Sequence, residues 1–408
     1  MDEPLAVRPS PPTRAPTLAP PPHRWVLALF AVTLGMWVGL LASAQVLLPS
    51  QIEAIAPGQK VWAMGVVTTV GAVAAALSGP FVGALSDRTT WRFGKRRSWA
   101  VGGSGLCAVA LLLLPWQTSL VGVGLCWVLV HGGVGGISAA LFAVVSDRVP
   151  VDRRGTVFAV VGFAQPVGLV LGTLLVSGVS VRVGYLLVGA LVVVLAVPYA
   201  LIGRDVPVRT SPARGWAPHL ASLGPDFGWA CAGRFAAQFA TSLATVYLLY
   251  FLRDEIKVGD PAQGVAVLSL MFTAGIVVVG LLVGRASDRV GRRKAFVIFA
   301  AMLMAAGLTA MGLVSTWAVA VVAAAALGGG YGAYLAVDQA LATQLLRGDD
   351  DRGKNLGLMN MAGSSAVAIA PVVAAGSVHI GGYAALFLLA AVVAVLGGLL
   401  VQPIKSVP

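Results

Sequence analysis

The chain has 408 residues, of which 58% are hydrophobic and only 11% are charged, and its mean hydropathy is +0.88. Soluble domains carry about 25% charged residues, so this composition excludes a soluble globular protein and predicts an integral membrane protein with the lipid bilayer as its solvent. The net charge of +12 would indicate a nucleic-acid partner in a soluble domain. In a membrane protein, an excess of lysine and arginine in the cytoplasmic loops sets the orientation. The positive net charge is explained in this way, and no nucleic-acid partner is expected.

Residues 1–23 are rich in proline and lack an apolar core, which predicts a disordered tail. Twelve apolar segments follow, each near the ~20 residues that a helix needs to cross the hydrocarbon. Because no water satisfies the backbone there, the segments are predicted to be helices, and the fold class is all-α. They cover residues 25–48, 61–85, 98–115, 120–145, 156–179, 183–203, 227–252, 263–284, 295–314, 317–346, 356–378 and 383–401.

Two short charged loops separate long apolar segments at corresponding places. Residues 83–97 read GALSDRTTWRFGKRR, and residues 284–294 read GRASDRVGRRK. The first glycine allows two helices to pack closely at the membrane edge, and the aspartate can meet an arginine or a helix N-terminus. The shared residues are Gly83, Asp87, Arg88, Gly94, Arg96 and Arg97 in the first loop, and Gly284, Asp288, Arg289, Gly291, Arg292 and Arg293 in the second.

The basic residues predict the orientation. If both termini are cytoplasmic, nearly all lysines and arginines fall in cytoplasmic loops, and the positive-inside rule is satisfied. Only Lys60, Arg182, Arg253 and Lys257 then lie outside. We therefore expect a multi-pass protein of the plasma membrane with both termini in the cytoplasm.

A second pair of segments repeats at nearly the same offset as the loops. Residues 132–155 and 330–353 are both Gly-rich helices that end in a charged loop. The chain is thus predicted to contain a tail (1–23), an N-terminal six-helix half (24–203), a polar cytoplasmic linker (204–224) and a C-terminal six-helix half (225–403). Parallel repeats of this kind, with a site at their interface, are typical of transporters that rock between two states.

These loops resemble the motif that the major facilitator superfamily carries between its second and third helices and repeats between its eighth and ninth. The resemblance covers roughly residues 24–403 and implies a cavity lined by the first, fourth, seventh and tenth helices. It also implies that both loops act as cytoplasmic gates and do not contact substrate. The stretched first loop resembles that of the sugar-type branches (glycoside–pentoside–hexuronide and sucrose carriers). Leu129 stands where the drug/proton antiporter branch has an arginine, with His131 nearby.

Few ionisable residues lie inside the predicted spans, where a charge costs about 2.5–3.5 kcal/mol and marks a functional candidate. Asp338 is the only acidic one, and Arg234 lies on the seventh helix. The resemblance places both facing one cavity, so they are candidates for a pair that couples transport to protons, with His131 as a third candidate; a purely structural ion pair is the alternative. Candidates for the substrate cavity are Gln45, Gln165, Gln238, Thr241, Thr245, Tyr331, Tyr334 and Asn360.

The sequence contains no P-loop, metal-ligand cluster or nucleophile constellation, so neither ATP hydrolysis nor enzymatic chemistry is expected, and no cofactor. We predict a secondary transporter that moves a small organic solute by alternating access, coupled to protons and acting as a monomer. The sequence leaves two alternatives for the solute: an amphipathic compound that is exported, or a sugar-like solute that is taken up. A non-transporting sensor on the same fold is a further alternative.

Overall fold

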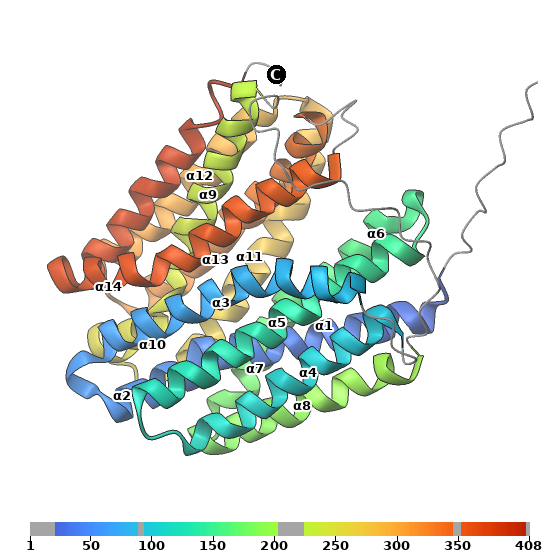
Figure 1. Cartoon of the computed structure of the whole chain (residues 1–408). Helices are drawn as coiled ribbons and strands as arrows, with labels where there is room; N and C mark the ends of the chain where they lie inside the picture. Colours follow the sequence, from blue (N-terminus) through green and yellow to red (C-terminus); the bar gives the residue numbers. More distant parts are fainter. Residues whose placement is uncertain (1–20, 89–93, 203–223, 346–351, 405–408) are drawn as a thin grey trace, which may run out of the picture.

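The computed structural model describes residues 21–88, 94–202, 224–345 and 352–404, and within these ranges it contains helices and no strand. Residues 1–20 of the predicted tail (1–23) and residues 204–223 of the predicted linker (204–224) lie outside the described residues. In Figure 1 the helices form two bundles that lie next to each other, one from the first half of the chain (blue to green) and one from the second half (yellow to red).

The first bundle contains eight α-helices. Its first span is continuous through α1, a π-helical turn η1 and α2, and its fifth span is divided at Phe163 into α6 and α7. The bounds are α1 His23–Ala42, η1 Ser43–Leu47, α2 Leu48–Ile55, α3 Lys60–Arg88, α4 Lys95–Leu113, α5 Leu120–Arg148, α6 Val151–Gly162, α7 Ala164–Ser177 and α8 Val181–Ile202.

The second bundle repeats this order. Its first span bends by 46° where α9 meets α10. Its last helix, α14, is interrupted at Gly381 and Gly382, and Gly382 has a φ of 68°, which glycine adopts readily because it has no Cβ. The bounds are α9 Gly224–Val246, α10 Leu248–Phe251, the π-helical η5 Leu252–Ile256, α11 Pro261–Val290, α12 Arg293–Leu313, α13 Trp317–Leu345 and α14 Arg352–Leu399.

The number of membrane spans agrees with the prediction. Among the described residues, 10 helical runs are long and apolar enough to cross a membrane, or 11 with the bent pair of α9 and α10. The α14 helix counts once in that tally although its backbone is interrupted. When its two arms, residues 352–380 and 383–399, are taken separately, the total is the twelve that the hydrophobic pattern predicts.

Close helix contacts repeat between the two bundles. A Cβ added to Gly103 of α4 would lie 2.8 Å from the carbonyl oxygen of Gly133 on α5. In the second bundle, a Cβ on Gly330 of α13 would lie 2.6 Å from the carbonyl oxygen of Ala300 on α12. Glycine at such points lets two backbones approach without side chains between them. The third and fourth spans of each half therefore pack in the same way.

The most extensive contacts between the two halves are those of α3 with α14 and of α7 with α11. We call the end of the bundle that carries the loops 83–97 and 284–294 the motif end, and the other the opposite end. The opposite end lies toward the left of Figure 1, where α2 and α10 are labelled. Large apolar side chains such as Leu77, Leu201 and Val322 are exposed on the outer helix faces, as expected for surfaces that face lipid.

Candidate functional site

A buried ion pair joins the seventh and tenth spans. Arg234 of α9 donates from Nε to Oδ2 of Asp338 on α13 at 2.9 Å, and its Nη2 contacts the same oxygen. The two residues expose 8% and 4% of their surface, so solvent screens their attraction far less than it would at the surface. The structure thus brings together the two ionisable residues that the sequence analysis selected as a candidate pair.

Further hydrogen bonds surround this pair. Tyr334, one turn before Asp338 on α13, donates its hydroxyl to Oδ1 of that carboxylate at 3.0 Å. Arg234 Nη1 donates to Oδ1 of Asn360 on α14 at 2.8 Å. Buried charges need such partners, because an unpaired one costs several kcal/mol. The cluster joins three spans of the second half, and Asn360 is exposed, so the cluster reaches the molecular surface through that residue.

A second polar contact lies one helical turn along α9. Tyr331 of α13 donates its hydroxyl to Oε1 of Gln238 at 2.6 Å, and its ring stacks on Phe272 of α11 with centroids 6.1 Å apart. The hydroxyls of Thr241 and Thr245 donate to carbonyls of their own helix, at 2.9 Å and 3.0 Å. Gln238 and Tyr331 therefore continue the polar surface of α9 and α13 away from the ion pair.

Phe272 also lines a small pocket between the two halves. Gln45 and Leu169 line it from the first half, and the second half supplies the other nine lining residues, Thr245, Ser269 and Leu327 among them. Eight of the eleven are apolar. A helix rises about 1.5 Å per residue, which places Thr245 about 16 Å along α9 from Arg234. The pocket and the ion pair are thus two ends of one surface.

The remaining candidates lie elsewhere. His131 of α5 meets the ring of Trp127 edge-on at 5.1 Å and packs beside Gly71 of α3. Its Nδ1 is buried without a hydrogen-bond partner in the described part of the chain. These contacts lie inside the first half, so the structure does not join His131 to Arg234 and Asp338. Gln165 is exposed on α7, and its side chain is not among those that line the pocket.

The motif loops lie at helix ends. In the second loop, Gly291 has a φ of 73° and ends α11, while Asp288 and Arg292 on either side are exposed. In the first loop, Arg96 Nε lies 3.2 Å from Oδ2 of Asp147 at the end of α5. The side chains of Asp87 and Arg88 lie outside the described residues. The described parts place both loops at the same end of the bundle, away from the pocket.

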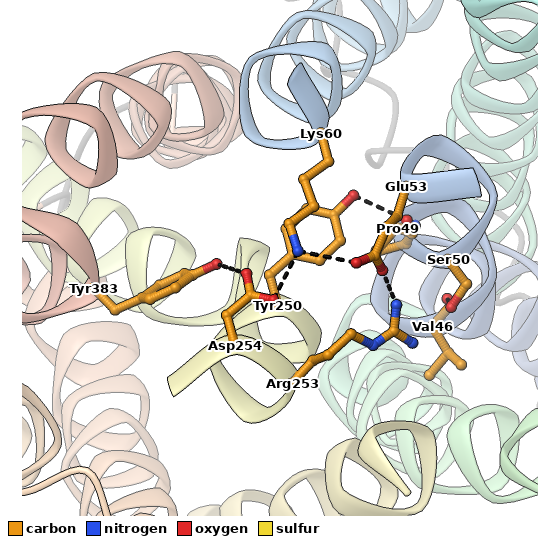
Figure 2. Close-up of polar contacts among 9 residues, drawn as sticks. All are labelled: Val46, Pro49, Ser50, Glu53, Lys60, Tyr250, Arg253, Asp254 and Tyr383. Carbon is orange, nitrogen blue, oxygen red and sulfur yellow. Dashed lines mark hydrogen bonds and ion pairs between the residues drawn. The ribbon is translucent and has the colours of Figure 1, made fainter. Parts of the chain in front are cut away.

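The sequence analysis missed a second cluster of charges, at the opposite end. Figure 2 shows Glu53 and Lys60 of the first half beside Arg253 and Asp254 of the second. The predicted spans ended at residues 48 and 252, whereas the helices continue to Ile55 and Ile256. These charges therefore belong to the first and seventh spans and not to loops. The sequence did contain a signal for this cluster. An acidic and a basic residue follow the first predicted span of each half.

Two six-helix halves, with a buried polar cluster inside the second half and a pocket between the halves, form the architecture of a membrane transporter built from repeats. The family model described as Major Facilitator Superfamily matches residues 25–229 and 230–407, one match for each half. The chain belongs to this superfamily. Both the family resemblance and the predicted fold class are confirmed, and membership indicates membrane transport without enzymatic chemistry.

Three solved structures share the fold. A bacterial homolog of the human lysosomal transporter Spinster, inward-facing and occupied, has a TM-score of 0.72 and 14% identity over 94% of this chain and 96% of that chain. A mutant of the nucleoside transporter NupG has a TM-score of 0.75 and 12% identity, with 93% and 100% covered. The human organic anion transporter MFSD10 has a TM-score of 0.68 and 17% identity, with 94% and 100% covered. A comparison with curated proteins finds no match.

Proposed function

We propose that this chain is a proton-coupled secondary transporter of the plasma membrane that moves a small organic solute by alternating access. The observation that carries the proposal is the Arg234–Asp338 pair, a carboxylate and a guanidinium buried together beside an exposed asparagine. An ionisable pair at this depth is costly to a membrane helix. Asp338 can take up a proton, and Arg234 loses its ion-pair partner when it does. The pair therefore offers a physical means of coupling proton binding to solute transport.

Coupling follows from an exchange of partners. When Asp338 is ionised, it holds Arg234 through two contacts and ties α9 to α13. When Asp338 is protonated, this attraction is lost, and Arg234 becomes available to an anionic or hydroxylated part of the solute. Asn360 already accepts one hydrogen bond from Arg234, so a solute group would enter next to it. The proton and the solute then bias the same two-state element.

The lining of the pocket favours an amphipathic solute over a sugar. A sugar needs many hydrogen-bond partners, whereas the lining of this pocket offers the polar groups of Gln45, Thr245 and Ser269 among eight apolar residues. Binding sites with mostly apolar walls and a few polar groups suit ligands of the same composition. The three proteins of the same fold named above are described as a nucleoside transporter, an organic anion transporter and a transporter homolog without a stated cargo, so the proposal rests on the residues of this chain.

The orientation and the oligomeric state are part of the same proposal. Both termini and both motif loops lie on the cytoplasmic side, because the basic residues of the chain concentrate there. In this proposal the transporter works as a monomer. The opposite end then faces the extracellular side.

Reconstitution into proteoliposomes with a pH-sensitive dye in the lumen tests the coupling. A panel of one hexose, one disaccharide, and amphipathic organic anions and cations is added in turn, and both solute flux and proton flux are recorded. We expect proton flux with an amphipathic solute. The Asp338→Asn variant should lose accumulation driven by a pH gradient yet retain downhill exchange of the same solute.

A matched control and the alternatives complete the experiment. Glu255→Gln also removes one acidic charge, at an exposed position, and should accumulate solute like the parent. Accumulation by Asp338→Asn at the parent level would make the pair structural and His131 the next residue to substitute. Flux of the sugars alone would reverse the choice of solute. Binding of a panel member without any flux would favour the sensor.

A further inference from the structure

Four charged side chains form a continuous ion-pair cluster between the two halves at the opposite end (Figure 2). Lys60 Nζ lies 2.7 Å from Oδ1 of Asp254 and 2.9 Å from Oε1 of Glu53, and Arg253 Nη1 contacts Oε2 of Glu53. Tyr383 donates its hydroxyl to the other oxygen of Asp254 at 2.9 Å. Two of the three ion pairs, Lys60 with Asp254 and Arg253 with Glu53, cross from one half to the other.

The bend in the seventh span places the second-half members of this cluster. The α9 helix ends at Val246, Tyr247 leaves helical geometry, and α10 with η5 continues at 46°. This short segment carries Tyr250, Arg253 and Asp254 against the first half. On the other side, Glu53 lies on α2 and Lys60 begins α3. The cluster thus joins segments that are far apart in sequence.

Two tyrosines of the second half add uncharged hydrogen bonds to the first half. The hydroxyl of Tyr250 donates to the carbonyl oxygen of Pro49 at 2.9 Å. The hydroxyl of Tyr247 donates to the carbonyl oxygens of Val61 at 2.8 Å and Pro371 at 3.2 Å. Lys60 Nζ also lies 5.0 Å from the centroid of the Tyr250 ring, where a cation is attracted to the aromatic face. The halves are therefore closed against each other at this end.

The arrangement of the charges allows the cluster to open. Each half contributes one acid and one base, and separation would break the two pairs that cross the interface. Lys60 would keep Glu53, and Asp254 would keep the hydroxyl of Tyr383, because those contacts lie within one half. The side chains are 17–37% exposed, so water can solvate the charges that lose a partner. A fully buried pair would resist such separation more strongly.

We propose that Glu53, Lys60, Arg253 and Asp254 form the gate that holds the end opposite the motif loops closed in one of the two transport states. These residues are positioning residues for transport and do not contact the solute. Lys60 is central because it pairs with acids of both halves. The inference rests on alternating access in the proposed function and not on proton coupling, so a conformational measurement without solute or pH gradient tests it separately.

Spin-label distances across the opposite end provide that measurement. Labels are attached at Thr118→Cys and Ser315→Cys, one exposed position in each half at this end, in a background in which Cys107, Cys126 and Cys231 are replaced by alanine. Distance distributions are recorded in lipid nanodiscs. We expect Lys60→Met to increase the population with the longer distance about fivefold, as for a loss of about 1 kcal/mol from the Asp254 and Tyr250 contacts that Lys60 makes across the interface. This variant leaves Glu53 paired with Arg253.

Two further variants make the test specific. Lys257→Met removes the same charge from an exposed residue of the same end, for which the described part of the chain shows no ion pair, and it should leave the distribution unchanged. The double variant Lys60→Met, Asp254→Asn should shift the distance distribution no further than the larger of the two single changes. Both substitutions remove the same ion pair, Lys60 with Asp254, so their effects are not additive. An unchanged distribution in Lys60→Met, an equal shift in Lys257→Met, or additive shifts in the double variant would each overturn the proposal.

Discussion

The Arg234→Ala variant tests whether the buried pair is held as the geometry indicates. Its removal leaves the carboxylate of Asp338, whose side chain is 5% exposed, with the hydroxyl of Tyr334 as its remaining described partner. Removing one partner of a buried pair costs about 3–5 kcal/mol, because the other charge stays uncompensated. Removing both charges avoids that penalty. We therefore expect Arg234→Ala to be markedly less stable than Arg234→Ala combined with Asp338→Asn.

Thermal unfolding in nanodiscs measures this difference, followed by the fluorescence of the native tryptophans. The double variant should recover most of the loss in unfolding midpoint. Arg182→Ala serves as the control, since Arg182 lies over the ring of Trp116 at the opposite end and such a contact contributes about 1 kcal/mol or less. Equal midpoints for Arg234→Ala and the double variant would refute the reasoning, because an unpaired Asp338 would then cost nothing.

Three other predictions test separate parts of the molecule. Gly65→Ala would bring a Cβ to 2.9 Å from the hydroxyl of Tyr247, so it should lengthen the spin-label distance across the opposite end, whereas Gly58→Ala, with nothing within 4 Å, should not. Asp87→Asn and Asp288→Asn should slow turnover at unchanged solute affinity, the former more strongly; a loss of equilibrium binding contradicts the assignment of the motif loops as gates. A thiol at Thr90 should be protected from an impermeant reagent outside intact cells, and labelling there would reverse the topology.

The sequence by itself determined the class of protein and its helices. A chain with 11% charged residues can satisfy its backbone in lipid only through helices, so apolar length alone predicted the twelve spans. The two copies of the charged loop fixed the repeat and with it the superfamily. Even the separation of the last two spans followed from pattern, since the apolar segments are interrupted near Gly381 and Gly382, where the backbone of α14 changes direction.

The helix faces were also accessible from the sequence. Arg234 and Gln238 fall on one face of the seventh helix by their spacing, and Tyr331, Tyr334 and Asp338 on one face of the tenth. Periodicity cannot say which partner each side chain meets. The family resemblance had suggested Arg234 and Asp338 as a pair. The tertiary structure decided that Arg234 also reaches Asn360, that Tyr331 reaches Gln238, and that His131 packs against Trp127 inside the first half.

Contacts between the halves were decided by tertiary structure alone. Glu53 and Asp254 lie about two hundred positions apart in the sequence, and both predicted spans end before the first charged residue of the cluster. The structure continues both helices beyond that point and bends the seventh at Tyr247, which turns Arg253 and Asp254 toward Glu53 and Lys60. Pairing across an interface depends on how two bundles cross, and that angle is set by side-chain packing along α3, α7, α11 and α14, which no local pattern encodes.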